Sequence, residues 1–312
     1  MIKAVFATPV PEEYQQEFTK FTDVDFHFIP RMKVRDEDIK DAEIILGNLP
    51  EEMVNQCENL KWLQLDSAGA NLYKNLNEKV ILTNASGAYG TAISEHMLAC
   101  VLMVMKKLPE YMEIQKERGF VNLGSVNTVT TSKVLSVGMG DIGTNFAQKM
   151  NALGAEVYGV RRSIHDKPDF VKELYTSETM DAILPECDIV ALSLPETDET
   201  VSLFNAERLR KMKKGSILVN VGRGSAIDTM ALYEVMQEGH LGAACLDVTD
   251  PEPLPKNHPL WNTKNVYITP HISGRFNAHV TFDLVMKIYK DNLTHYLNGE
   301  PLEHIVDRHI GY

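Results

Sequence analysis

The segment Val134–Gly143, VLSVGMGDIG, constrains the fold more than any other part of the chain. An apolar run ends in a G-x-G-x-x-G motif and a helical pattern follows at once, which is typical of dinucleotide-binding domains. Gly138 would allow a tight turn, Gly140 would let backbone approach a pyrophosphate, and Gly143 would let the helix pack closely on the strand. Free N–H groups at the start of that helix would face the phosphates. Taken alone, the motif is also compatible with an ordinary glycine-rich loop.

Short apolar runs alternate with segments able to form helices along the whole chain, which predicts parallel α/β sheets. The fingerprint strand and five further candidates make six strands in the second half, the number in a doubly wound dinucleotide domain. The candidate strands lie at 2–7, 25–29, 43–47, 63–65 and 80–82, and then at 156–160, 188–194, 216–221, 243–248 and 266–268.

Two crossings between domains are expected. The first unit would end in one long helix over about 92–117, and the polar connection 119–132 is a plausible interdomain boundary. A companion crossing is expected near 273–277, where the C-terminal helix would return to the first unit.

Composition excludes several other classes of protein. The net charge of −12 argues against a nucleic-acid partner, which would need a basic patch. Four widely spaced cysteines predict reduced thiols of a cytoplasmic protein, with no disulfide framework and no metal site. The N-terminus has no signal-peptide pattern, and the longest apolar run, Met97–Met105, is too short to span a membrane.

The residues after the second strand of the dinucleotide domain indicate the coenzyme. An Asp or Glu normally ends that strand and binds the adenosine ribose 2′-hydroxyl. Here Arg161, Arg162 and Ser163 follow Val160. A guanidinium can pair with a 2′-phosphate that an acidic residue would repel. We therefore expect NADP, with NADPH preferred over NADH; the alternative is a pair of solvated surface arginines.

Three later segments carry polar residues where parallel strands should end, which is where α/β sheets bind ligands. They are 218–224 (LVNVGRG), 246–254 (LDVTDPEPL) and 269–274 (TPHISG). Together with the fingerprint, the segment 188–195 (DIVALSLP) and the run 210–228, they resemble the D-isomer-specific 2-hydroxyacid dehydrogenase family over nearly the whole chain. The NADP-using glyoxylate/hydroxypyruvate reductases are the subgroup that the arginine pair favours.

The resemblance implies an α/β protein of two Rossmann-like domains. A doubly wound dinucleotide-binding domain, 99–276, would be inserted in a smaller flavodoxin-like substrate domain, 1–98 and 277–312. The family is further expected to form a homodimer, with the long helix from Ala92 and its apolar flank as a candidate interface.

The resemblance also implies the catalytic residues Arg223, Glu252 and His271. Reduction of a 2-oxo acid needs hydride at the carbonyl carbon and a proton on its oxygen. A histidine can supply that proton near neutral pH, and a neighbouring carboxylate stabilises the imidazolium. Arg223 would bind the substrate carboxylate and polarise the keto oxygen. We expect His271 to be the proton donor, Glu252 its partner and Arg223 the substrate anchor.

The remaining expected contacts carry over by motif. The residues expected to bind the coenzyme are Gly138, Gly140, Asp141, Ile142, Gly143, Arg161, Arg162, Ser163, Leu194, Pro195, Thr200, Val221, Gly222, Arg223 and Asp247. Substrate contacts are expected at Ala68, Gly69, Arg223 and His271. Leu49 could line the same pocket by a looser alignment. His96, in Ser94-Glu95-His96, is expected to be structural or to border the coenzyme.

The chain departs from the family pattern in two further places. Segment 119–131 lacks the frequent Trp, and Thr249 stands where an aromatic residue is common, which weakens inference about the substrate. The favoured function is reduction of a small 2-oxo acid to the D-2-hydroxy acid. One alternative is D-3-phosphoglycerate dehydrogenase, whose substrate phosphate could use Arg31, Lys33 and Arg35. The other is a non-catalytic, NAD(P)-sensing corepressor-like regulator.

Overall fold

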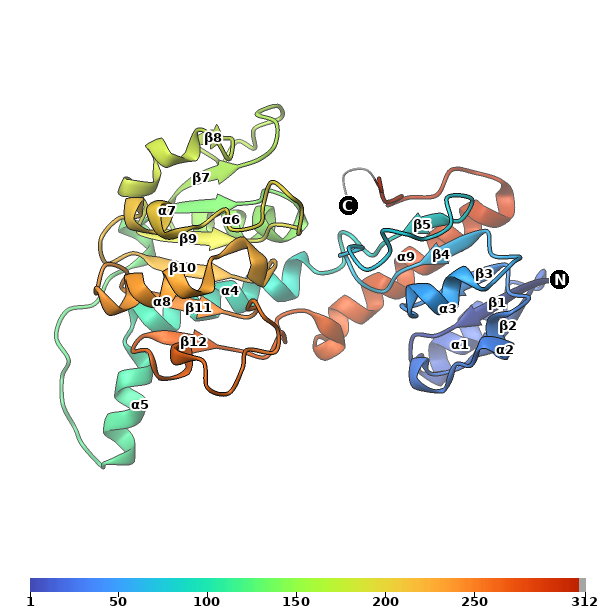
Figure 1. The fold of residues 1–312 in the computed structure, drawn as a ribbon, viewed down its shortest axis with the longest axis horizontal. Coiled ribbons are helices and arrows are strands. Elements are labelled where there is room, and N and C mark those ends of the chain that lie inside the picture. Colours follow the sequence, from blue (N-terminus) through green and yellow to red (C-terminus); the bar gives the residue numbers. More distant parts are fainter. Residues whose placement is uncertain (309–312) are drawn as a thin grey trace. The chain divides into compact units, whose positions relative to one another are not determined.

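The computed structural model describes residues 1–308 and divides into two compact units. Unit 1 comprises Met1–Tyr89 and the segment from Arg275 onward, and unit 2 comprises Gly90–Gly274. Each unit contains one parallel sheet with helices on its faces (Figure 1). Among the described residues, no helix has the length and apolar character needed to cross a bilayer.

The sheet of unit 1 has the strand order β2-β1-β3-β4-β5. This is the flavodoxin-like order, as expected for the first domain. Its strands are β1 (Ile2–Phe6), β2 (Val24–Phe28), β3 (Ile44–Leu46), β4 (Trp62–Gln64) and β5 (Ile81–Thr83). Its helices are α1 (Glu12–Phe18), α2 (Asp36–Ile39), α3 (Glu51–Asn55) and α9 (His279–Asn298).

Buried polar side chains attach the C-terminal helix α9 to this sheet. The amide of Asn292 donates to Gln64 Oε1 at 2.8 Å, and both side chains are fully buried. Tyr289 and Thr8 share a second buried hydrogen bond, at 3.1 Å. Because an unpaired buried amide is costly, this pairing specifies where α9 lies on the sheet.

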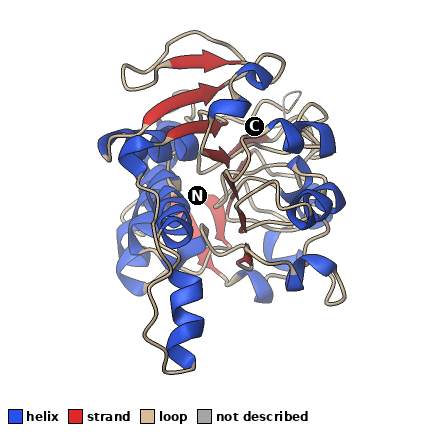
Figure 2. Ribbon diagram, turned by 90° about the vertical axis from the view of Figure 1, so that its left-hand side faces the viewer, coloured by secondary structure: helices blue, strands red, loops and turns tan. Residues whose placement is uncertain are grey.

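The sheet of unit 2 has the order β12-β11-β10-β9-β6-β7-β8, which is doubly wound about the fingerprint strand β6. Figure 2 shows helices on both sides of its strands. The strands are β6 (Lys133–Val137), β7 (Glu156–Val160), β8 (Glu173–Tyr175), β9 (Ile189–Leu192), β10 (Ile217–Asn220), β11 (Ala243–Leu246) and β12 (Val266–Ile268). The helices are α4 (Gly90–Met105), α5 (Leu108–Lys116), α6 (Asp141–Ala152), α7 (Ala206–Lys211) and α8 (Thr229–Gln237).

This sheet has seven strands, one more than the six predicted, because the sequence pattern does not reveal β8. Glu173, Leu174 and Tyr175 pair with β7 at the sheet edge, and none of the three is buried. An edge strand this short and this exposed has no buried apolar run for a hydrophobic pattern to reveal.

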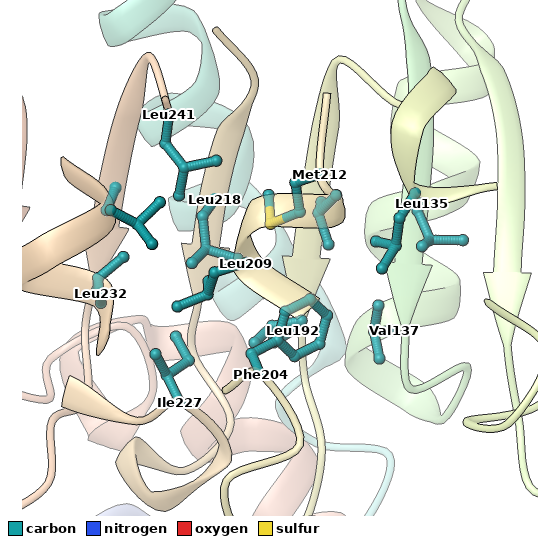
Figure 3. Packing of buried hydrophobic residues seen from close by; sticks show 14 of the residues in the cluster. Leu135, Val137, Leu192, Phe204, Leu209, Met212, Leu218, Ile227, Leu232 and Leu241 are labelled. Atoms are coloured by element: carbon teal, nitrogen blue, oxygen red, sulfur yellow. The ribbon is translucent and has the colours of Figure 1, made fainter. Parts of the chain in front are cut away.

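Apolar side chains from the strands and from α7 and α8 form the core on one face of this sheet (Figure 3). Leu135, Val137 and Leu192 come from the strands, and Leu209 and Leu232 come from the two helices. Strands covered on both faces read as continuous apolar runs, which is why the sequence shows them so clearly.

The predicted long helix over 92–117 is two helices. Lys107 adopts the left-handed conformation, with φ of 54°, and Pro109 lies in the first turn of α5. The left-handed residue breaks the helical path, and proline favours a new helix start.

The observed boundaries also differ from the predicted ones. The chain passes into unit 2 at Tyr89–Gly90, before α4 begins, because α4 packs along α6 and against β10 as part of that unit. The polar connection 119–132 therefore lies inside unit 2 and does not separate the units. The return crossing, Gly274–Arg275, falls within the expected stretch 273–277.

Candidate active site

The three motif glycines follow β6 and meet different surroundings. Gly138 has φ of +99°, and a Cβ on Gly143 would lie 1.8 Å from the carbonyl oxygen of Gly138. These two positions therefore need glycine for the turn and for helix packing. A Cβ on Gly140 would meet nothing within 4 Å. The open space at Gly140, in front of the start of α6, fits a dinucleotide pyrophosphate.

Asp141 and Ile142 begin α6, as the motif predicts, but the Asp141 carboxylate has a structural task. Its Oδ2 accepts the N–H of Gly90 at 2.7 Å, and its Oδ1 accepts the Asn145 amide at 3.0 Å. The side chain thus fixes the start of α4 to the start of α6. The expected contact of Asp141 with the coenzyme stays a prediction.

The arginine pair follows the carboxyl end of β7, where a Rossmann domain binds the adenosine ribose. Arg161 Nη1 donates to the carbonyls of His165 and Asp166, at 3.3 and 3.2 Å, and so braces the loop 161–166. Arg162 Nη2 lies 3.9 Å from Glu199. Arg162 and Ser163 are exposed. The loop therefore offers two guanidinium groups and a hydroxyl near this strand end.

The segments after β9 and β10 pack against each other next to the glycine loop. A Cβ on Gly222 would lie 2.5 Å from the carbonyl oxygen of Leu194, so glycine is needed there. Ser193 Oγ donates to the carbonyl of Gly138 at 2.8 Å. Thr200 Oγ1 donates to the carbonyl of Pro195 at 2.8 Å and closes the turn. Ser193 was not predicted, since a serine before a loop carries no distinctive sequence signal.

Arg223 is presented by a turn that a buried amide closes. Asn220, at the end of β10, donates to the Arg223 carbonyl at 2.9 Å and accepts the Gly222 N–H at 3.1 Å. The Arg223 guanidinium is half-buried, and its Nη1 donates to the Gly222 carbonyl at 2.9 Å. At Gly224 a Cβ would lie 2.0 Å from the Thr249 main chain, so this turn touches the loop that carries Glu252. Sequence reasoning did not single out Asn220, although it lies within the segment 218–224.

Glu252 and His271 meet although they lie nineteen residues apart in the chain. Nδ1 of His271 lies 2.6 Å from Oε1 of Glu252, and both side chains are about half-exposed. β11 and β12 are parallel neighbours, so the loops that follow them lie side by side at the carboxyl ends of the strands. Since the carboxylate accepts from Nδ1, Nε2 is the ring atom available for proton transfer.

Asp247 lies beneath this pair, almost fully buried at the end of β11. Its carboxylate accepts the N–H groups of Ile272 and Ser273, at 3.0 and 2.9 Å, and the Thr269 hydroxyl at 2.5 Å. Burial alone would raise the pKa of this carboxyl, but the hydrogen bonds outweigh burial and hold the pKa below its ordinary value. Asp247 thus holds the loop of His271; the expected contact with a nicotinamide carboxamide stays a prediction.

His96, on α4, approaches the same network. Its Nε2 lies 3.4 Å from the Thr269 hydroxyl and 3.6 Å from the Cys100 sulfur. The sulfur contact raises the pKa of His96 above its ordinary value. Thr269 was not singled out by sequence reasoning, because a threonine before Pro-His gives no signal of its own.

The residues expected to bind substrate in unit 1 lie in the loop after β4. Ser67 Oγ donates to the Gly69 carbonyl at 2.7 Å, and the Asn84 amide donates to the Ala68 carbonyl at 2.8 Å. Within residues 1–308, no main-chain carbonyl accepts the N–H of Ala68 or Gly69. The Leu49 side chain is buried in the hydrophobic core of unit 1, and its expected place in the substrate pocket stays a prediction.

Comparison with known proteins decides the family. Residues 98–273 match the NAD-binding domain of the D-isomer specific 2-hydroxyacid dehydrogenases. The chain belongs to that family. A putative 2-hydroxyacid dehydrogenase of Haemophilus influenzae is 32% identical over 272 residues, covering 82% of this chain and 84% of the relative.

Solved structures agree with the assignment of this 2-hydroxyacid dehydrogenase. A family protein from Aeromonas salmonicida has a TM-score of 0.89 and 29% identity, covering 98% of this chain and 99% of that one. An NADPH-dependent glyoxylate/hydroxypyruvate reductase from Sinorhizobium meliloti, solved with NADP and sulfate, has a TM-score of 0.85 and 25% identity, with both chains fully covered. The residues of unit 2 fit a dinucleotide coenzyme, given the cradle at Gly140. Across the described chain, no cluster of His, Cys, Asp or Glu could hold a metal ion.

Proposed function

We propose that this dehydrogenase reduces a small 2-oxo acid, of the size of glyoxylate or hydroxypyruvate, to the D-2-hydroxy acid with NADPH. The observation that carries the proposal is the hydrogen bond between His271 and Glu252, at 2.6 Å, on the sheet edge that also carries the dinucleotide loop. A histidine oriented by a carboxylate is suited to giving a proton to a carbonyl oxygen.

The roles of the residues follow from their atoms. The coenzyme, when bound, supplies hydride to the carbonyl carbon. His271, as imidazolium, gives the Nε2 proton to the carbonyl oxygen, and Glu252 stabilises that charge through Nδ1. Arg223 binds the substrate carboxylate with its planar guanidinium and polarises the keto oxygen. The N–H groups of Ala68 and Gly69 are proposed as further donors to the carboxylate. Within the chain, these two residues form hydrogen bonds through their carbonyl groups, which leaves the N–H groups for the substrate.

The preference for NADPH rests on the loop 161–166. Arg161 occupies the position where an acidic residue would otherwise select NAD, and Arg162 adds a second cation. The carbonyls of His165 and Asp166 hold the Arg161 side chain at this strand end. A 2′-phosphate on the adenosine ribose would meet two guanidinium groups and the Ser163 hydroxyl.

A homodimer is also proposed. Its interface lies on α5, the second half of the predicted long helix, and on the loop after it. Figures 1 and 2 show α5 and the loop after it projecting from unit 2. Large apolar side chains are exposed along this projection; they are Leu108, Met112, Phe120, Val121 and Val126. A second copy of the chain would cover them, because large apolar side chains exposed in one segment favour association.

The two alternative functions make different predictions about turnover. A phosphoglycerate dehydrogenase would need basic residues for a phosphate, yet Arg35, just before α2, already pairs with Glu37 and Asp38 of that helix. A corepressor-like regulator would bind dinucleotide without turning over 2-oxo acids.

The test is NADPH and NADH oxidation by the purified protein with glyoxylate, hydroxypyruvate, phosphohydroxypyruvate, pyruvate and a bulky 2-oxo acid. We expect the highest kcat/KM with NADPH and a small 2-oxo acid, and a D-configured product where the product is chiral. Turnover confined to phosphohydroxypyruvate, or binding of NADPH with no turnover of any acid, would refute the proposed function.

A further inference from the structure

Hydrogen bonds to one buried residue, Asp247, hold the loop that carries His271. The main-chain N–H of His271 donates to the Asp247 carbonyl at 2.9 Å, and the next two N–H groups donate to the Asp247 carboxylate. His271 itself is in the left-handed conformation, with φ of 51°. Because few non-glycine residues adopt this conformation, the bonds to Asp247 are what keep the loop in its turn.

The Asp247 carboxylate is in turn oriented by Thr269. The hydroxyl of Thr269 lies 2.5 Å from Oδ1, and an ionised carboxylate can only accept, so Thr269 donates. Oδ1 is also the atom that accepts the Ile272 N–H. The hydroxyl therefore fixes the same oxygen that holds the loop.

The single hydroxyl proton of Thr269 is committed to Asp247, so its contact with His96 can run in one direction only. Nε2 of His96, 3.4 Å away, must carry a proton and donate to the hydroxyl oxygen. The Cys100 sulfur, 3.6 Å from the same Nε2, can share that proton as a weak acceptor. Both the imidazolium and the Nε2–H tautomer of His96 satisfy this direction.

We propose that Thr269 and His96 are positioning residues of the enzyme, which hold the His271 loop through Asp247. The chain of bonds runs from His96 on α4 to the Thr269 hydroxyl, to the Asp247 carboxylate and to the N–H groups beside His271. Neither residue exchanges a proton with substrate. Loss of the Thr269 hydroxyl leaves the carboxylate free to rotate away from the loop, so His271 no longer keeps its alignment with Glu252. The effect on turnover rests on the proposed function; the effect on the loop does not.

Paired substitutions distinguish the effect of losing the hydroxyl hydrogen bond from the effect of changing the side-chain volume. Thr269→Val removes the hydroxyl at nearly constant volume, and Thr269→Ser keeps it. His96→Leu removes the N–H donor, and His96→Gln can restore one. Thr263→Val is the matched control, because Thr263 is a buried threonine of the same unit whose hydroxyl donates to the Pro259 carbonyl, away from the loop.

Three quantities are measured for each full-length variant: kcat, the Kd of NADPH by fluorescence, and hydrogen exchange of the Ile272 and Ser273 amides. We expect Thr269→Val to lower kcat by about tenfold or more, the effect of losing one hydrogen bond to a charged group. The same variant should speed exchange of both amides, and it should weaken NADPH binding by a smaller factor than it lowers kcat. Thr269→Ser should retain most of the kcat and the amide protection that Thr269→Val loses. His96→Gln should likewise retain most of what His96→Leu loses in these two quantities.

The proposal is overturned if Thr269→Val behaves like Thr263→Val in both kcat and amide exchange, or if Thr269→Ser is as impaired as Thr269→Val. A wild-type protein inert toward every 2-oxo acid would refute the proposed function instead. In that case the exchange rates of Ile272 and Ser273 still decide whether Thr269 and His96 hold the loop.

Discussion

The imidazole of His271 and the carboxylate of Glu252 are paired through atoms 2.6 Å apart, with both side chains 41% exposed. Unit 1 contains a pair of the same kind, His27 and Asp25, at 2.9 Å and with 42% and 55% exposure. The second pair joins near neighbours on β2, whereas the first joins two loops at a ligand-binding sheet edge. A histidine–carboxylate contact is therefore not a site by itself; its place in the fold makes it one.

Substitution of two motif glycines should separate coenzyme binding from folding. Gly140→Ala should fold normally but bind NADPH about tenfold or more weakly, since its Cβ enters the open cradle. Gly143→Ala should instead lower the Tm strongly, because its Cβ would lie 1.8 Å from the Gly138 carbonyl oxygen. Thermal unfolding and NADPH titration measure both effects. Equal loss of stability in the two variants would contradict the assignment of Gly140 to the pyrophosphate.

Replacement of Arg161 by the acidic residue typical of NAD enzymes should change the coenzyme preference. In Arg161→Asp, kcat/KM with NADPH should fall by roughly 100-fold, because a carboxylate repels the 2′-phosphate, while that with NADH is kept or rises. The control is Arg210→Asp, which breaks a surface pair with Glu238. An equal fall in kcat/KM with NADPH and with NADH would show that Arg161 only stabilises its loop.

The exposed apolar residues on the projection from unit 2 should hold two copies together. The wild-type protein should have about twice the chain mass of 35.1 kDa in light scattering. The double variant Met112→Asp, Phe120→Asp should approach the monomer mass, because charges would be buried in the interface. Met32→Asp, at a methionine of unit 1 that is more exposed than Met112 (94% against 62%), should leave the mass unchanged. A monomeric wild-type protein would disprove this interface.

Cys100 should be the reactive thiol. Its contact with Cys245, and then that with His96, lowers the pKa of Cys100, and its side chain is half-buried. Burial raises the pKa of Cys57 and Cys187, which keeps both protonated. A lowered pKa leaves the thiolate present near neutral pH, so alkylation of Cys100 should change little between about pH 7 and about pH 9. Peptide mass spectrometry after iodoacetamide treatment measures each site; faster labelling of Cys187 would contradict the assignment.

Much of this enzyme could be read from its sequence because the informative residues follow buried strands. The fingerprint at Gly138–Gly143 and the polar residues after β10, β11 and β12 lie in chain order at strand ends, and parallel strands bring those ends to one edge. The contact between Glu252 and His271 follows from that topology.

Other features depend on contacts that a linear pattern does not carry. The break at Lys107 is a backbone conformation, and α4 belongs to unit 2 because of what it packs against. The structural use of the Asp141 carboxylate depends on the approach of Gly90 from a distant segment. The role proposed for Thr269 rests on its hydrogen bond to Asp247, which only the three-dimensional geometry reveals.

In the proposed reaction His271, held by Glu252, protonates the carbonyl oxygen of the substrate. The most direct measurement is single-turnover NADPH oxidation with glyoxylate by His271→Ala, beside His27→Ala as the control histidine of a surface pair. We expect the rate of the His271 variant to fall by about 10²- to 10⁴-fold with NADPH binding intact, the usual contribution of a general acid, and that of the His27 variant to stay at the wild-type level. A His271→Ala enzyme that oxidises NADPH at a near-normal rate would show that His271 is not the proton donor.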